Sequence, residues 1–174
     1  MCQSCHSGLP LSFEVVDEAG IVAAATAAHE SKQAWHFHVL APRCTFSPKP
    51  GAYTFLLELT DAKRTLCAYY DDKPTALNKQ LLPLLHGADA LADKPATASL
   101  SDEDEALLAT IEAAAKAGSS WHHHMMFPAC GLNTSDGKWR LFVEIDGSEP
   151  VIRDYVDEPS RVLNRIERIY FGLN

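Results

Sequence analysis

The sequence contains one group of potential metal ligands twice. Residues 35–44 read WHFHVLAPRC and residues 121–130 read WHHHMMFPAC, so that Trp-His-x-His, a proline and a cysteine recur in the same order. Imidazole nitrogens and thiolate sulfurs are ligands for Zn(II), and imidazole also suits Fe(II), Ni(II) and Cu(II). The repetition therefore predicts two transition-metal sites, with Zn(II) as the favoured ion.

The spacing within each segment suggests how the ligands come together. On a strand, residues i and i+2 point to the same face, so His36 and His38 would form a chelating pair. A proline then ends the strand, and a chain reversal there could return Cys44 to the same place. A set of His36, His38 and Cys44 would leave a fourth position for another side chain or for water. The corresponding set in the second segment is His122, His124 and Cys130.

A non-metal interpretation of the same residues stays open. The histidines could form hydrogen bonds within a polar core, and the two cysteines could be small buried apolar residues. All three ligand types recur, however, while neighbouring positions differ, such as Val39 in one segment and Met125 in the other. This selective retention favours metal binding.

Two glutamates interrupt apolar runs of strand length. Glu58 lies in FLLEL and Glu144 in LFVEI, and a carboxylate inside such a strand is costly unless it is paired or lies on a wet face. Either residue could be a further ligand, an acceptor for a ligating histidine, or a catalytic base that moves a proton beside a metal. A solvent-facing position on a half-exposed sheet is the structural alternative. We expect Glu58 and Glu144 to be the catalytic residues if the protein is an enzyme.

The N-terminus carries a further cysteine pair. Cys2 and Cys5, followed by His6, form C-x-x-C-H, and two thiolates at this spacing can bind one Zn(II). The pair has no counterpart in the second half, so it would add either an asymmetric ligand or a separate structural site. The motif also matches the attachment site of c-type haem, but no export signal precedes it. A terminus with incidental thiols is the remaining alternative.

The repetition extends beyond the two segments. At an offset of 121 − 35 = 86 residues, about eleven of roughly fifty paired positions are identical, where composition alone would give about three. The sequence thus predicts an α+β fold made by internal tandem duplication of an α-β-β-β-α unit, with pseudo-twofold symmetry and antiparallel sheets flanked by helices. We expect a first repeat at 1–87, a linker at 88–100 and a second repeat at 101–174, packed as one globular unit.

Hydrophobic periodicity and capping residues predict the individual elements. Asp17 and Ser101 are placed to begin the first helix of each half. The expected helices are 17–32, 74–86, 101–117 and 159–171, and the expected strands are 11–16, 36–41, 53–59, 65–70, 122–127, 139–145 and 151–156.

Composition excludes several classes of protein. The chain has 174 residues and a net charge of −8, and its 15 lysines and arginines form no basic stripe, which argues against nucleic-acid binding. No apolar run approaches the roughly 20 residues of a membrane helix, so we expect no membrane partner and a cytoplasmic location. A small-molecule or protein partner stays open.

These patterns lead to one leading hypothesis and one alternative. The leading hypothesis is a transition-metal-binding protein of duplicated architecture, most favourably with Zn(II); if it is an enzyme, the expected chemistry is metal-assisted hydrolysis or a related lytic step. The alternative is a non-catalytic pseudo-dimeric binding module with a structural metal or with none. A closed set of four ligands would favour the alternative, and an open coordination position would favour the enzyme.

Overall fold

The structure is a computed structural model that describes residues 13–92 and 100–173, and this part of the chain has an α+β fold. It comprises four helices and two sheets. In chain order the elements are β1 (Phe13–Val15), α1 (Glu18–Glu30), β2 (Trp35–Leu40), β3 (Tyr53–Leu59), β4 (Arg64–Tyr70), α2 (Thr75–His86), α3 (Asp102–Lys116), β5 (Trp121–Met126), β6 (Trp139–Ile145), β7 (Val151–Tyr155) and α4 (Ser160–Tyr170). Every predicted helix and strand is present, and most bounds differ from the prediction by one or two residues.

The helix starts follow from local capping. The carboxylate of Asp17 accepts a hydrogen bond of 2.8 Å from the backbone N–H of Gly20, at the start of α1. The hydroxyl of Ser101 accepts one of 3.2 Å from the N–H of Asp104, at the start of α3. Each cap satisfies one of the N–H groups that the first helical turn leaves unpaired, and the predicted N-cap Ser101 is confirmed.

The two sheets share one strand order but differ at one edge. The second sheet has the order β5-β6-β7, and the corresponding strands of the first sheet are β2-β3-β4, each antiparallel to its neighbour. In the first sheet β1 also pairs with β4, and this pair is parallel. The prediction of purely antiparallel sheets is therefore wrong for the first sheet. The reason is the crossover: α1 carries the chain back, so β1 runs in the direction of β2 and hence of β4.

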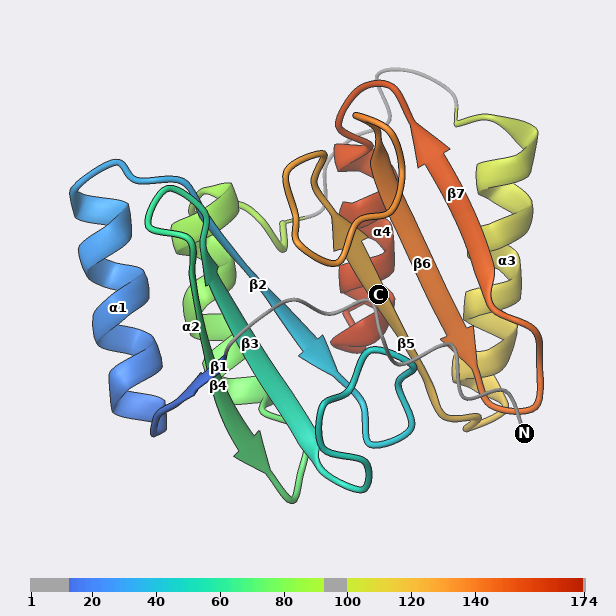
Figure 1. Cartoon of the computed structure of the whole chain (residues 1–174). Coiled ribbons are helices and arrows are strands. Elements are labelled where there is room, and N and C mark those ends of the chain that lie inside the picture. The colour runs from blue at the N-terminus through green and yellow to red at the C-terminus, as the bar shows by residue number, and fades with distance from the viewer. Residues whose placement is uncertain (1–12, 93–99, 174) are drawn as a thin grey trace.

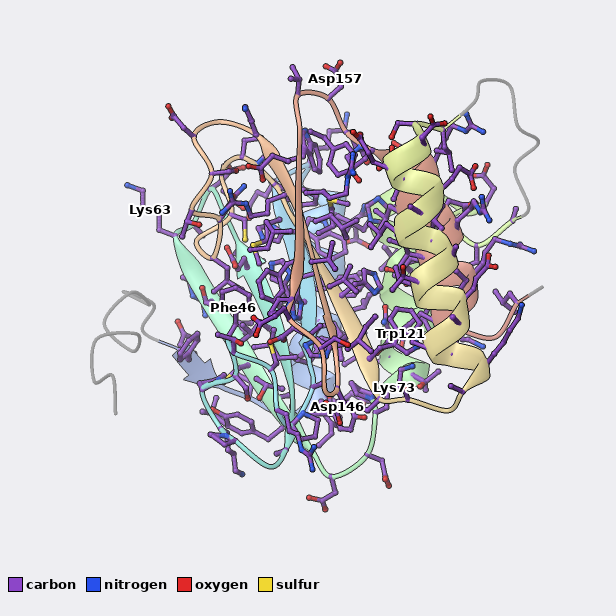
Figure 2. The ribbon with its side chains drawn as sticks, turned by 90° about the vertical axis from the view of Figure 1, so that its right-hand side faces the viewer. Phe46, Lys63, Lys73, Trp121, Asp146 and Asp157 are labelled. Carbon is purple, nitrogen blue, oxygen red and sulfur yellow. The ribbon has the colours of Figure 1, made fainter. Side chains whose placement is uncertain are left out.

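Each sheet has helices on one face only. Helices α1 and α2 pack on the first sheet, and α3 and α4 pack on the second (Figures 1 and 2). On these faces the cores are built from aliphatic side chains, among them Ile21, Leu57 and Leu81 in the first half and Ile111 and Val143 in the second. The opposite faces of the sheets are thus left for a different layer.

That layer is a core shared by both halves. It contains Leu40 and Leu56 from the first sheet and Met126 and Phe142 from the second, and it lies where β2 and β5 contact each other. The loop after β2 (residues 41–52) lies beside β5, and the loop after β5 (residues 127–138) lies beside β2 (Figure 1). These exchanged loops decide how the functional site is assembled.

Two predictions about organisation are not tested by this arrangement. The duplication and its pseudo-twofold axis stay predictions, as does the division at 88–100, where residues 93–99 lie outside the described part. Among the helices of the described residues, none combines the length and the apolar character needed to cross a membrane.

Candidate metal centres

The first candidate centre, centre A, consists of His36, His38, Glu58 and Cys130. The two histidines alternate along β2, as the strand period requires. Glu58 pairs with His36 in the antiparallel register of β2 and β3, so its carboxylate points to the same face. Cys130 comes from the exchanged loop of the other half. One local pairing and one long-range contact therefore bring four donor side chains together.

Four donor-to-donor distances in centre A are close to the ligand spacing around a tetrahedral ion. Nε2 of His36 lies 3.4 Å from Glu58 Oε2, and Nε2 of His38 lies 3.6 Å from Oε1. The sulfur of Cys130 lies 3.3 Å from His38 Nε2 and 3.5 Å from Glu58 Oε1. Ligand bonds of roughly 2.0 to 2.3 Å, as around Zn(II), set tetrahedral ligand atoms about 3.3 to 3.8 Å apart. The protein thus already holds these donors at ligand spacing.

The second candidate centre, centre B, consists of Cys44, His122, His124 and Glu144. Its strand register is the same as in centre A, because His122 pairs with Glu144 across β5 and β6. The sulfur of Cys44 lies 3.2 Å from His124 Nε2, and His122 Nε2 lies 2.7 Å from Glu144 Oε2. In each centre the donor atoms all lie within 4.8 Å of one another.

The donor atoms of the two centres have few protein partners. Nε2 of His36 in centre A is buried without a hydrogen bond in the described residues, and Nε2 of His122 in centre B contacts Oε2 of Glu144 at 2.7 Å. Buried polar atoms are almost always satisfied, so unpaired ones need an explanation such as an ion. In each centre an imidazole nitrogen faces a carboxylate oxygen, and a cation between such donors fits as a further partner.

The cysteines are not where the sequence placed them. We expected Cys44 to join His36 and His38, and Cys130 to join His122 and His124, but each sulfur lies in the centre of the other half. The predicted grouping is therefore wrong, although all six residues do lie in the two clusters. The physical reason is that each chain reversal is part of a loop that crosses to the neighbouring sheet. The loop packs there because the shared core buries it.

Burial controls the charge of the ligands. It lowers the pKa of His38 to about 3, with His36 adding to the effect, and it also lowers the pKa of His124. Both imidazoles are therefore neutral at pH 7, which is the form that binds metals. Burial raises the pKa of both cysteine thiols, and a bound cation would reverse this preference and favour the thiolate.

The two glutamates are held by the exchanged loops as well. The backbone N–H of Gly131 donates a 3.1 Å hydrogen bond to Glu58 Oε2, and the hydroxyl of Thr45 donates one of 2.6 Å to Glu144 Oε1. Burial raises the pKa of Glu58, but His36, His38 and this N–H outweigh burial and bring the pKa to about 2. Sequence reasoning missed Thr45 and Gly131. The sequence signal that could have found them is their position, since Thr45 directly follows Cys44 and Gly131 directly follows Cys130.

The two centres are neighbours in the molecule. The rings of His38 and His124 have centroids 6.0 Å apart, across the contact of β2 with β5. Phe46, labelled in Figure 2, packs its ring 5.8 Å from that of His124 and 5.0 Å from that of Phe142. The centres therefore lie in the shared core. Cys2 and Cys5, also predicted as ligands, lie outside the described residues.

No family model matches the chain, and neither a curated protein nor a solved structure shows significant similarity to it. The functional argument therefore depends on the geometry of the two centres. The structure establishes that buried His, Cys and Glu groups are positioned to hold metal ions.

Proposed function

We propose that this protein binds two transition-metal ions, one in each centre, and that each ion fastens the two halves to each other. The observation that carries the proposal is the exchange of cysteines, which makes every centre span both halves. An ion held in this way would stabilise the contact of β2 with β5 that the shared core also forms. In such a protein the binding energy of the metal becomes folding energy.

Zn(II) fits the donor set best. Two imidazoles, one carboxylate and one thiolate are all common zinc ligands, and the mixture of nitrogen, oxygen and sulfur suits a tetrahedral ion of intermediate softness. With the carboxylate and the thiolate both ionised, the net charge of a Zn(II) centre is zero. A neutral centre is the form that a buried position tolerates.

Metal content measured by mass spectrometry on untagged protein tests this proposal. We expect two equivalents of metal per chain, and one equivalent in each of His36→Ala and His122→Ala. Wild-type protein without bound metal, also after refolding with Zn(II), would overturn the proposal. Folded variants that keep both equivalents would overturn the assignment of ligands.

An internal duplication would explain why two such centres exist. The repeated segments, the offset of 86 residues and the matching pairs His36–Glu58 and His122–Glu144 support it. A duplicated chain commonly keeps the contact of an ancestral homodimer. In such a dimer, loops exchanged between subunits would place a cysteine of each subunit in its partner's centre.

Metal-assisted hydrolysis at centre B is a second candidate function. It is favoured by one observation, a pocket of about 430 Å³ that His122 and Glu144 line. A zinc ion supplies Lewis acidity, which activates water and polarises carbonyl groups. Glu144 would have to leave the ligand set, and its carboxylate in the lining of the pocket would then hold or move the proton. Turnover of activated esters by zinc-loaded protein, lost in Glu144→Gln but kept in Glu58→Gln, is the expected result.

A further inference from the structure

The two centres differ in what covers their first histidine. In centre A the ring of Phe127 packs against that of His36, with centroids 4.5 Å apart. At the offset of 127 − 41 = 86 residues, the matching position near His122 is Ala41. An alanine has no ring to fill this space. Ala41 instead lines the pocket that reaches His122 and Glu144.

The pocket has the size of a small-molecule site. Its volume is about 430 Å³, which lies within the usual range of roughly 300 to 1,000 Å³ for ligand pockets. It borders two residues of centre B and none of centre A. Its lining residues are Ala41, Pro42, Arg43, Tyr53, Ser120, His122, Glu144, Ile145, Asp146, Gly147, Ser148 and Pro150.

The lining of the pocket offers one cationic group, Arg43, beside the carboxylates of Glu144 and Asp146. The side chain of Arg43 is 83% exposed, and its guanidinium forms an ion pair of 3.2 Å with Asp146. Asp146, labelled in Figure 2, lies in the turn after β6. Such an exposed ion pair contributes little and exchanges easily. A ligand carboxylate could take both N–H donors of the guanidinium fork. Arg43 therefore provides an anchor that a competing anion can use.

Glu144 is held so that another carboxylate could replace it. The hydroxyl of Thr45 donates to Oε1, a hydrogen bond that leaves the other carboxylate oxygen for the centre. That oxygen, Oε2, lies 2.7 Å from Nε2 of His122. An incoming carboxylate has the same charge and donor atoms as the group that it displaces. The exchange would leave the charge at the ion unchanged.

From these observations we propose that the pocket over His122 binds a small carboxylate, which reaches the ion of centre B in the place of Glu144. The inference rests on the proposed two-metal function. Centre A holds the same donors, but Phe127 packs on His36 and the cavity beside His38 is only about 50 Å³, so this centre would keep its four protein ligands. One residue of difference between the halves thus separates a ligand-binding centre from a closed one.

Cobalt(II) provides a direct test, because its visible absorption reports a change of ligands. Full-length protein loaded with two equivalents of Co(II) is titrated with acetate, and with acetamide as the uncharged isostere. We expect a saturable spectral change with acetate and none with acetamide, while both equivalents of cobalt stay bound. Arg43→Gln should weaken acetate binding by on the order of tenfold.

Two variants, each of which introduces the residue of the other centre or its equivalent, test where acetate binds. Ala41→Phe should keep both cobalt ions but lose the response to acetate, and Phe127→Ala should add a second response at centre A. Two bound cobalt ions without any acetate response would overturn this inference and leave the two-metal proposal standing. An unchanged response to acetate in Ala41→Phe would show that acetate does not bind in the pocket beside Ala41. Failure to bind cobalt or zinc at all would overturn the proposed function itself.

Discussion

Centre A and centre B contain the same four donor types in the same strand register, but they differ in their surroundings. The side chains of His36 and Glu58 are 2% and 7% exposed, whereas those of His122 and Glu144 are 9% and 16% exposed. Phe127 packs against His36 in centre A, whereas in centre B a pocket lined by Ala41 adjoins His122 and Glu144. The comparison teaches that two centres with the same donor side chains can differ in solvent exposure. The residue beside the first histidine can decide whether a pocket reaches the donors.

The largest expected difference between the centres concerns stability. His36→Ala removes a ligand beside a carboxylate that is almost fully buried, and we expect a loss of about 3 to 5 kcal/mol in the free energy of unfolding. His122→Ala should cost only about 2 kcal/mol, because the carboxylate of Glu144 is closer to water than that of Glu58. Urea denaturation of the zinc-loaded variants measures both values. Equal losses would contradict the distinction between a closed and an open centre.

The exchange of cysteines predicts which variants act on the same ion. Cys130→Ser should weaken metal binding at centre A by about 100-fold and leave centre B unchanged. The double variant Cys130→Ser/His36→Ala should bind as much metal as His36→Ala alone. The double variant Cys130→Ser/His122→Ala should lose the ions of both centres. Metal content of the single and double variants decides this. The opposite pattern would mean that each cysteine serves its own half.

The rate of metal loss should also separate the centres. With an excess of chelator, we expect the ion of centre B to leave faster, by on the order of tenfold, because centre A must open locally before it can react. A coloured chelator shows two kinetic phases in stopped-flow absorbance. In Phe127→Ala the two rates of metal loss should become similar. A single kinetic phase in the wild type would contradict the idea that the chelator reaches the two centres unequally.

The smallest expected effect concerns the loop residue that holds Glu144. Thr45→Val removes the 2.6 Å hydrogen bond to Oε1 and should weaken metal binding at centre B by several-fold, equivalent to about 1 kcal/mol. The isosteric control is Thr110→Val in α3, whose hydroxyl bonds only within its own helix in the described structure. Competition with a zinc indicator measures the affinity. An equal effect in both variants would indicate a general loss of stability.

Much of the fold was accessible from the sequence because its signals are local. Strand period 2 places His36 and His38 on one face, and polar N-caps begin α1 and α3 at Asp17 and Ser101. The parallel pairing of β1 with β4 was missed. A three-residue strand at an edge has no sequence feature that specifies its partner, and its position depends on where α1 packs.

The sequence by itself determined which residue types the two centres contain and how the histidines within each pair are spaced, because strand geometry relates residues two positions apart. Only the tertiary structure decided that Glu58 and Glu144 belong to the clusters, through strand register, and that the cysteines are exchanged between halves. Those contacts join residues 22 to 92 positions apart. They depend on how two sheets and their loops pack around a shared core, which no local pattern encodes.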